Sequence, residues 1–497
     1  MKRLYAIFAA CLLSLTVMAQ QSSLVGTWQL LDSNGLPTTS AKIFMPDGKL
    51  LALSFNSDFS NSSVWFMGSY EVLSDTSYRE HVLYHSSINY QCDSYIISHQ
   101  QNDSMRVTQF STFLPNGHFS TSTGRWKKMN RPMPTYSEEE WQSLYQKSLA
   151  EFDRVPKEGQ SVEQFAQELY DKAKDYKNAK KLDRTIEALL IRAELDTTNA
   201  KWQREALGFY LSNNSAPSIA EKIADRYIRL TEAAAPTPTD TSVVSAYRAK
   251  GYLYSYRGNI CLEQARQIFN KCIQMETTAG HQPSKDYGLD YFALAMGYMP
   301  NGEFDKLYDC AIKCIDIFEK APDVSDNQKG EAYEMAGIAL MNNDRNREAI
   351  DMLQKCVTLF NGEKAYKMTN EIYPVITKCY MNLQEKNPKD KKLKKEIEQF
   401  MADKIIYQVF EATNKEFNLW GEYIVLEKDN WTIENPTGET GQENDKHHYL
   451  LCKGNEYRDI NTKEGQSLNT TAHVKQVDAA EKQEIIKQWK EYRKNKK

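Results

Sequence analysis

Histidine and cysteine side chains are the residues of this sequence best suited to chemistry, and they form two small groups. His81 and His85 share one face of a predicted strand, because alternate side chains of a strand point to the same side. Cys92 and His99 follow nearby, so a transition-metal site is conceivable. Neither an H-E-x-x-H motif nor a tight C-x-x-C pair accompanies them. Ordinary strand histidines are therefore favoured, and no metal site is predicted.

A second group near the C-terminus, His447, His448 and Cys452, carries the same weak metal signal and is better explained as a turn and strand. The sequence lacks a glycine-rich phosphate loop, a G-x-S-x-G elbow and other catalytic signatures. Scattered carboxylates such as Asp175 and Glu187 are typical of solvated helix faces. We therefore predict a non-enzymatic protein with no catalytic residue and no cofactor. A hydrolase or lyase site assembled across domains remains an alternative.

The N-terminus predicts export. Lys2 and Arg3 precede an apolar run, Leu4–Val17, and small residues at Val17-Met18-Ala19 stand before Gln20. An uncleaved anchor is one alternative, and Phe8-Ala9-Ala10-Cys11 resembles a lipoprotein cleavage box. The run is short for a membrane span and no other stretch approaches one, so no stable span is expected after signal removal. We expect a periplasmic or extracellular protein, with envelope association left open.

Charge and length narrow the class of partner. The chain has 497 residues, enough for two or more domains, and a net charge of −4. Removal of the first nineteen residues, which include two basic ones, changes the net charge to −6. A nucleic-acid partner usually requires a concentrated basic face, so none is predicted.

One short pattern recurs every 42 residues in the middle of the chain. Apolar or small residues stand in spacing i, i+4, i+7, which is helical, and a cysteine takes the last position each time. A fixed period of this size predicts a stacked array of helical hairpins. The three copies are Ala265, Phe269 and Cys272, then Leu307, Ala311 and Cys314, then Ala349, Leu353 and Cys356.

The repeated cysteines first suggest disulfides, since eight cysteines remain once Cys11 is removed with the signal. Equivalent positions on packed helices lie roughly 8–10 Å apart or more, which is beyond the Cα separation of a disulfide. Cys310 and Cys314 are four apart on one predicted helix, which is also poor geometry for a disulfide. We therefore expect Cys272, Cys314 and Cys356 to be small packing residues.

A partner helix precedes each copy. The best match has an aromatic residue, then two adjacent small residues, then an apolar one, at Tyr333, Ala336, Gly337 and Leu340. This pattern resembles the first helix of a tetratricopeptide repeat, and the resemblance to that family extends from about Lys181 to Gly362. Small residues at this position allow two helices to approach closely. The 42-residue spacing exceeds the 34 residues of the family, so longer helices or connections are expected. The other matches to the first helix are Leu207, Gly208 and Leu211, then Tyr247, Gly251 and Tyr254, then Tyr291, Leu294, Ala295 and Tyr298.

Residues from Leu24 to about Met129 instead show about eight short β segments. Pro46-Asp47-Gly48 and Pro115-Asn116-Gly117 are sharp hairpin signals, and the pattern predicts an up-and-down barrel or a closed sandwich. Gly26-Thr27-Trp28 in the first strand and Gly124-Arg125-Trp126 in the last resemble lipocalin-like barrels. That resemblance implies a barrel in which an arginine of a late strand lies over the first indole.

Several boundaries are also predicted. Ser137 with Glu140, and Ser161 with Gln164, have capping-box spacing, and Pro374 is expected to kink a helix of the last pair, Met368–Gln384 and Asp390–Phe410. Tyr423–Leu426 and His448–Cys452 are expected to pair as strands, before a final helix at Ala479–Tyr492.

The predicted fold class is α+β multidomain. The predicted parts are a signal peptide at 1–19, a lipocalin-like antiparallel β barrel at 20–130, a tetratricopeptide-like α-solenoid at 135–410 and a mixed C-terminal tail or cap at 411–497.

The resemblance to tetratricopeptide repeats implies which side chains line the groove of the array. Their aromatic and Met content suits a peptide or partner helix. We therefore predict an interaction or scaffold protein with a protein or peptide partner. Burial of this face beneath other elements, and an apolar-ligand carrier using the barrel, are the alternatives. The predicted groove residues are Trp202, Phe209, Arg248, Tyr252, Phe292, Met296, Glu334 and Ile338.

Overall fold

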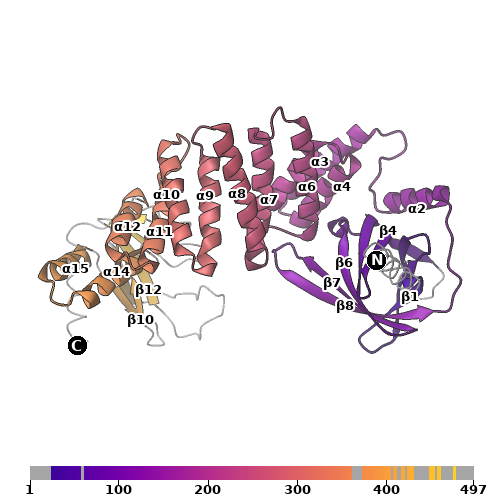
Figure 1. The fold of residues 1–497 in the computed structure, drawn as a ribbon, viewed down its shortest axis with the longest axis horizontal. Coiled ribbons are helices and arrows are strands. Elements are labelled where there is room, and N and C mark those ends of the chain that lie inside the picture. The colour runs from indigo at the N-terminus through magenta and orange to yellow at the C-terminus, as the bar shows by residue number, and fades with distance from the viewer. Residues whose placement is uncertain are drawn as a thin grey trace, which may run out of the picture. The chain divides into compact units, whose positions relative to one another are not determined.

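The computed structural model describes residues 24–56, 61–360 and 372–403, together with the backbone of six short strands between residues 407 and 476 (Figure 1). The chain divides into two compact units, residues 1–281 and residues 282–497. We describe each unit by itself. The predicted signal peptide at residues 1–19 and the predicted helix at residues 479–492 lie outside the described residues.

The first unit begins with eight antiparallel strands that close into an up-and-down barrel. Each strand pairs with the next, and β1 also pairs with β8, so that Trp28 lies opposite Lys42 on one side and Lys128 on the other. Gly48 and Gly117 have φ of +83° and +78°, which confirms the two predicted hairpin turns. The strands are β1 (Gly26–Leu31), β2 (Pro37–Phe44), β3 (Lys49–Phe55), β4 (Ser62–Ser74), β5 (Ser77–His85), β6 (Ser94–Asn102), β7 (Met105–Phe113) and β8 (Phe119–Met129).

The arginine that covers Trp28 comes from β7 and not from the Gly-Arg-Trp motif. Arg106 is 3% exposed, and its guanidinium carbon lies 5.5 Å from the centroid of the Trp28 ring. Arg125 is exposed and donates two hydrogen bonds to loop carbonyls. The expected arginine of a late strand is thus Arg106, and Arg125 cannot take this place because neighbouring residues of a strand point to opposite faces. Since Trp126 points into the barrel core, Arg125 points outward.

A helix covers part of the outer face of the barrel. α2 (Glu138–Glu151) begins at the predicted capping box, in which Ser137 and Glu140 exchange hydrogen bonds. Trp141 packs with Met67 and Tyr84 in a cluster separate from the barrel interior. Period-two alternation along the strands therefore fills two cores, one inside the barrel and one beneath α2.

Three helical hairpins complete the first unit. At Gly251 a Cβ would lie 2.9 Å from Phe269, so the predicted need for a small residue is confirmed there. At Gly208 a Cβ would meet nothing within 4 Å, so packing does not require that glycine. The helices are α3 (Val162–Asn178), α4 (Leu182–Leu195), α5 (Ala200–Ser212), α6 (Ser218–Ala234), α7 (Thr241–Tyr256) and α8 (Leu262–Ala279), with short 3-10 turns η1 (Ile88–Tyr90) and η2 (Gly258–Cys261).

The second unit contains a further series of helical hairpins. At Gly337 of α11 a Cβ would lie 2.6 Å from Leu353 of α12, so these helices pack closely. Figure 1 shows α9 to α12 standing side by side. The helices are α9 (Lys285–Tyr298), α10 (Phe304–Lys320), α11 (Asp326–Asn342), α12 (Asn346–Phe360), α14 (Tyr373–Lys386) and α15 (Lys391–Asp403), with η3 (Met299–Asn301) after α9.

The recurring cysteines are packing residues, as predicted. Cys272, Cys314 and Cys356 are fully buried, and none of these three described residues is joined in a disulfide. Cys272 Sγ lies 3.8 Å from the carbonyl oxygen of Val244 on the preceding helix. The cysteine therefore fills the place where the second helix of a repeat meets its neighbour.

The C-terminal part differs from the prediction in two places. Pro374 lies in the first turn of α14 and does not kink it, because the first helical positions have no intrahelical N–H bond to lose. Tyr407–Phe410, expected in the last helix, forms strand β9. The expected strand pair is confirmed, since β11 (Tyr423–Asp429) pairs antiparallel with β12 (His447–Lys453). The remaining short strands are β10 (Glu416–Leu419), β13 (Glu456–Asp459) and β14 (Val474–Gln476).

Candidate functional site on the helical array

The predicted groove residues of α5 lie against their own unit. Trp202 is half-buried, and the guanidinium of Arg192 lies 4.9 Å from its ring centroid. Arg192 is buried and also pairs with Glu205. Phe209 is buried in the core of the first hairpins. This end of the predicted groove is therefore largely covered by side chains of α4 and α5.

The groove residues of α7 are held by α8. Arg248 is buried, and its Nη2 donates a 3.0 Å hydrogen bond to Oε1 of Glu276. Oε2 of Glu276 lies 2.5 Å from Nδ1 of His281. Tyr252 packs edge-on against Phe269, with ring centroids 5.3 Å apart, and stays half-buried. The charge of Arg248 is thus neutralised within the unit, and only the Tyr252 ring is partly available.

The groove residues of the second unit are more accessible. Phe292 and Met296 lie one helical turn apart on α9, and Met296 is 45% exposed. Phe292 is partly buried against the core formed by α9 to α11. On α11, Ile338 is half-buried, whereas Glu334 is buried. Of the predicted groove residues of this unit, those that remain accessible are therefore apolar.

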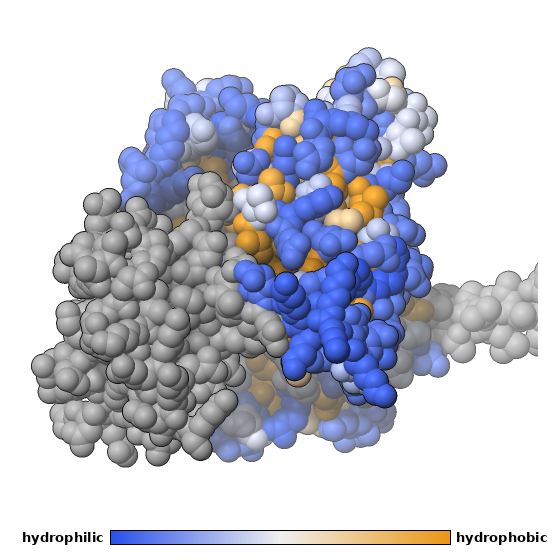
Figure 2. Space-filling model, turned by 90° about the vertical axis from the view of Figure 1, so that its left-hand side faces the viewer, coloured by the Kyte–Doolittle hydropathy of each residue, from blue (hydrophilic) through white to orange (hydrophobic). Residues whose placement is uncertain are grey.

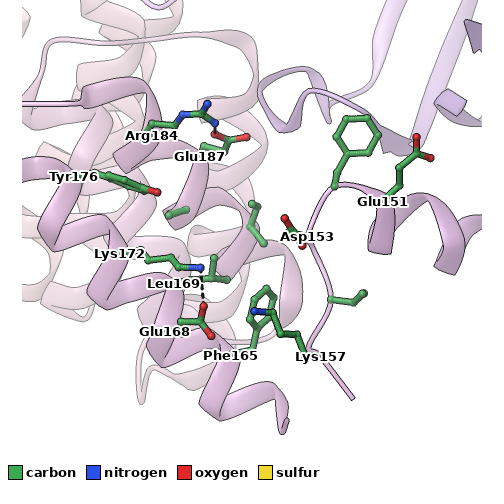
Figure 3. A pocket seen from close by; sticks show the side chains of 14 residues that line it. Glu151, Asp153, Lys157, Phe165, Glu168, Leu169, Lys172, Tyr176, Arg184 and Glu187 are labelled. Atoms are coloured by element: carbon green, nitrogen blue, oxygen red, sulfur yellow. Dashed lines mark hydrogen bonds and ion pairs between the residues drawn. The ribbon is translucent and has the colours of Figure 1, made fainter. Parts of the chain in front are cut away.

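A hollow of about 400 Å³ lies where the connection after α2 meets α3 and α4 (Figure 3). Glu168 and Lys172 form a 2.6 Å ion pair in its wall, and Arg184 pairs with Glu187 at 2.8 Å. Phe165 and other apolar side chains form part of its lining. Because these wall charges are paired one turn apart, the hollow offers no strong field of either sign. It contains none of the predicted groove residues.

A second hollow of about 800 Å³ lies between α12, α14 and α15 in the second unit. Tyr373, Ile376 and Phe400 contribute its apolar lining, and Lys392 and Lys395 its basic side chains. Figure 2, which views the side where α14 and α15 lie, shows hydrophobic residues among hydrophilic ones. Apolar side chains are thus accessible at this end of the described array as well as on α9.

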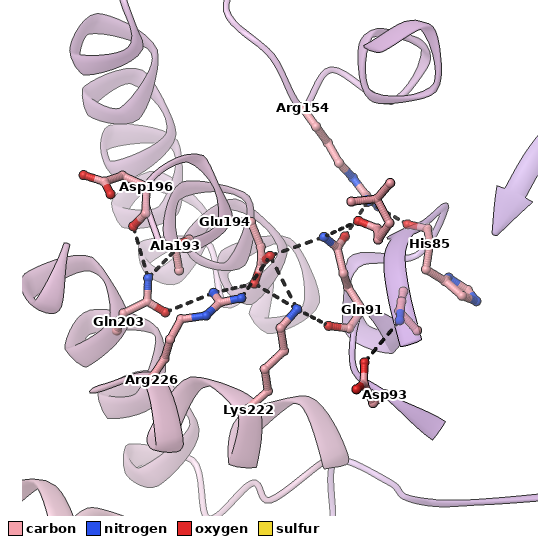
Figure 4. A network of polar contacts seen from close by, with 12 residues as sticks. His85, Gln91, Asp93, Arg154, Ala193, Glu194, Asp196, Gln203, Lys222 and Arg226 are labelled. Atoms are coloured by element: carbon pink, nitrogen blue, oxygen red, sulfur yellow. Dashed lines mark hydrogen bonds and ion pairs between the residues drawn. The ribbon is translucent and has the colours of Figure 1, made fainter. Parts of the chain in front are cut away.

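A polar network joins the barrel to the array within the first unit (Figure 4). Glu194 of α4 accepts a 2.7 Å hydrogen bond from Nη1 of Arg226 on α6 and lies 3.4 Å from Nζ of Lys222. Lys222 also donates to the carbonyl oxygen of Gln91, which follows η1 of the barrel, at 2.6 Å. Burial lowers the pKa of Lys222, and Glu194 opposes that shift. The carboxylate of Glu194 therefore interacts with two cationic side chains where the barrel meets the helices of the first unit.

Arg154, in the connection between α2 and α3, reinforces this junction. It is buried, and its Nη1 donates to the carbonyl oxygen of His85 at 2.6 Å and to Oε1 of Gln91 at 3.3 Å. Its Nη2 donates to the carbonyl oxygen of Ser86. The sequence did not indicate this network, because its members come from four separate segments with no shared spacing.

The barrel interior is occupied by its own side chains. Trp28, Phe44, Tyr78 and Trp126 belong to one buried cluster inside the strands. Lys42 and Glu80 form a buried ion pair at 2.5 Å, and the Tyr78 hydroxyl donates to the same carboxylate oxygen at 3.3 Å. A carrier would need an interior free for its ligand. The packed aromatic cluster therefore gives the carrier alternative no support.

The candidate metal residues do not converge. His81 Nδ1 lies 2.7 Å from Oδ2 of Asp93, whereas His85 Nδ1 contacts the backbone of Ser87. Within the described residues, no group of three or more His, Cys, Asp or Glu side chains is placed to hold a metal ion. The side chains of His447, His448 and Cys452 lie outside the described residues.

None of the described helices has the length and apolarity needed to cross a membrane.

Comparison with known proteins adds only distant structural similarities. No family model matches the chain, and a search of curated proteins found no match. TPR-like repeats of a Podosopora anserina protein described as a kinesin light chain are 13% identical, with a TM-score of 0.32, covering 41% of this chain and 96% of theirs. The MamA protein is 18% identical over 41% of this chain and 96% of its own, with a TM-score of 0.31. The P58(IPK) TPR domain is 16% identical, with a TM-score of 0.22, covering 53% of this chain and 69% of its own. Similarity at this level carries no argument about function, so the fold assignment rests on the barrel and helical hairpins themselves.

Proposed function

We propose that the protein is an exported, non-enzymatic scaffold that binds a protein or peptide partner on its helical array. One observation carries the proposal. Met296 is 45% exposed on α9, one turn from the half-buried Phe292, at positions where the repeat pattern predicts a groove. Exposed Met and aromatic side chains on one helix face suit the burial of another apolar surface.

The partner's chemistry follows from the accessible side chains. The charged groove residues Arg248 and Glu334 are buried, so neither is available as an external anchor. Phe292, Met296 and Ile338 offer apolar contact, and a flexible Met side chain adapts to different shapes. We therefore expect an amphipathic helix or an extended segment that presents apolar side chains at regular spacing.

Export rests on the sequence of the first nineteen residues. The basic start at Lys2 and Arg3, the apolar run and the small residues before Gln20 are the observations that support it. N-terminal sequencing of the protein recovered from the source organism tests this part. A mature chain that starts at Gln20 supports export by signal cleavage, whereas an intact Met1 contradicts that cleavage. A lipid-modified Cys11 would also show export, with the protein anchored to the envelope.

Site-specific photocrosslinking tests the binding surface. A benzoylphenylalanine placed at Met296 is expected to crosslink to a discrete partner in the source organism. The same group at Lys313, an exposed position on the second helix of that hairpin, is the matched control. Equal labelling from both positions, or no discrete product from Met296, would contradict the proposed surface.

A further inference from the structure

A cavity of about 500 Å³ lies inside the first unit, where the barrel meets the helical array. Asn89 and Tyr90 of η1, together with the turn between β7 and β8, form the barrel side. The start of α4, the end of α5 and the connection that follows α5 form the other side. It is distinct from the exposed face of α9 and contains one of the predicted groove residues, Phe209.

The two walls of this cavity are fixed to one another. Ser218 Oγ of α6 accepts a 2.9 Å hydrogen bond from the backbone N–H of Phe113. The backbone N–H of Ala216 donates to the carbonyl oxygen of Pro115 at 3.0 Å. The Arg257 guanidinium lies 4.1 Å from the ring centroid of Phe113. The cavity is therefore preformed, which reduces the ordering cost that a ligand would meet.

The lining combines aromatic rings with side-chain amides. Among the described residues that line the cavity, none is Lys, Arg or His, and the only acid is Asp183. The side-chain amides of Asn89 and Asn214 make no hydrogen bond within the described part of the chain, and the Tyr90 ring is 41% exposed. The aromatic residues are Tyr90, Phe113, Phe209 and Tyr210, and the amides are Asn89, Asn116, Asn213 and Asn214.

We propose that this cavity binds a neutral saccharide. A sugar ring presents an apolar C–H face that packs on an aromatic ring such as Tyr90. Its edge carries hydroxyl groups that both donate and accept, as the Asn amides do. An anionic ligand would find no cation in the lining, and a purely apolar ligand would leave the amides unpaired.

Isothermal titration calorimetry with the full chain tests the proposal, using cellohexaose, maltohexaose and chitohexaose as probes. At least one is expected to bind, and Tyr90→Ala is expected to weaken that binding about tenfold or more. Tyr95→Ala is the matched control, because Tyr95 is 53% exposed on β6 and lies outside the lining. Asp183→Asn keeps a hydrogen-bonding group and removes the charge, so a neutral ligand is expected to keep its affinity.

Four results would overturn the proposal. The first three are the absence of binding by all three saccharides at millimolar concentration, equal losses in the Tyr90→Ala and Tyr95→Ala proteins, and a Tyr90-dependent site that takes a proline-rich peptide but no saccharide. The fourth is a large loss of saccharide affinity in Asp183→Asn, which would assign binding to the carboxylate in place of the aromatic rings and amides. None of these outcomes depends on the surface of α9, so the scaffold proposal is tested separately.

Discussion

The Arg106 guanidinium lies over the indole of Trp28, 5.5 Å from the ring centroid, inside the barrel. Its Nη1 also donates a 2.7 Å hydrogen bond to Ser98 Oγ on the neighbouring strand. Burial lowers the pKa of Arg106. A cation that joins β1, β6 and β7 in this way fixes three strands of the barrel through one side chain.

Replacing Arg106 tests this role. Arg106→Ala is expected to lower the free energy of unfolding by about 3 kcal/mol, because it removes both a cation–π contact and a buried charge-assisted hydrogen bond. Arg125→Ala, at the exposed arginine of the sequence motif, is expected to cost less than about 1 kcal/mol. Urea unfolding of the two variants measures both values. Equal losses would contradict the assignment of the barrel lock to Arg106.

The junction between barrel and array depends on Glu194. Glu194→Ala leaves the partly buried Lys222 and Arg226 without their carboxylate, and a loss of about 2 kcal/mol is expected in the free energy of unfolding of the first unit. Glu187→Ala on the same helix removes an exposed ion pair and is expected to cost under about 1 kcal/mol. Chemical denaturation, with limited proteolysis at the 152–161 connection, measures the difference. Unchanged stability and unchanged cleavage in Glu194→Ala would show that the network does not hold the junction.

His85 is expected to make stability depend on pH. Burial lowers its pKa from 6.5 to about 4. As the pH falls from about 6.5 towards about 4, His85 therefore binds a proton in the unfolded chain but not in the folded chain. This difference lowers the free energy of unfolding, by up to roughly 3 kcal/mol once the pH is below that window. Above about pH 6.5 both states are neutral at this residue, and its contribution to the pH dependence vanishes.

Thermal unfolding measured against pH tests this dependence. His85→Gln is expected to flatten the stability curve between pH 4 and 6.5, compared with the natural protein. His118→Gln, at an exposed histidine of the β7–β8 turn, is the control and is expected to keep the full slope. A slope that persists unchanged in His85→Gln would assign the titration to other groups.

Two buried tyrosines are expected to respond differently to loss of the hydroxyl. Tyr254 donates a 2.7 Å hydrogen bond to Glu221, so Tyr254→Phe is expected to cost about 1.5 kcal/mol. The Tyr210 hydroxyl has no partner among the described residues, so Tyr210→Phe is expected to change stability by less than about 0.5 kcal/mol, or to raise it. Calorimetric unfolding of both variants makes the comparison. A large loss in Tyr210→Phe would reveal a partner for that hydroxyl.

The repeats could be predicted because they rest on local spacing. A helix exposes residues i, i+4 and i+7 on one face, so the buried cysteines and the close contact of Gly337 with Leu353 followed from the pattern. The barrel likewise followed from strand alternation and two hairpin signals. Gly208 also matches the repeat pattern, but close helix packing does not require a glycine there, since its surroundings leave room for a side chain.

The contacts between segments could not be predicted. Arg106 reaches Trp28 across a closed sheet, and Glu194 meets Gln91 across a hundred residues of chain. Such pairs depend on strand register and on domain docking, which no local period encodes. The burial of Phe209, Arg248 and Glu334 could not be predicted from the sequence for a related reason. Repeat positions indicate a face, whereas the neighbouring elements decide how much of it stays exposed.

Binding of the photocrosslinked partner to the surface of α9 tests the scaffold account most directly. Biolayer interferometry with that partner would compare the natural protein, a Phe292→Ala/Met296→Ala double variant and a Lys313→Ala control. The account predicts that the double variant binds at least about tenfold more weakly, while the control binds as the natural protein does. Unchanged affinity of a correctly folded double variant would contradict it.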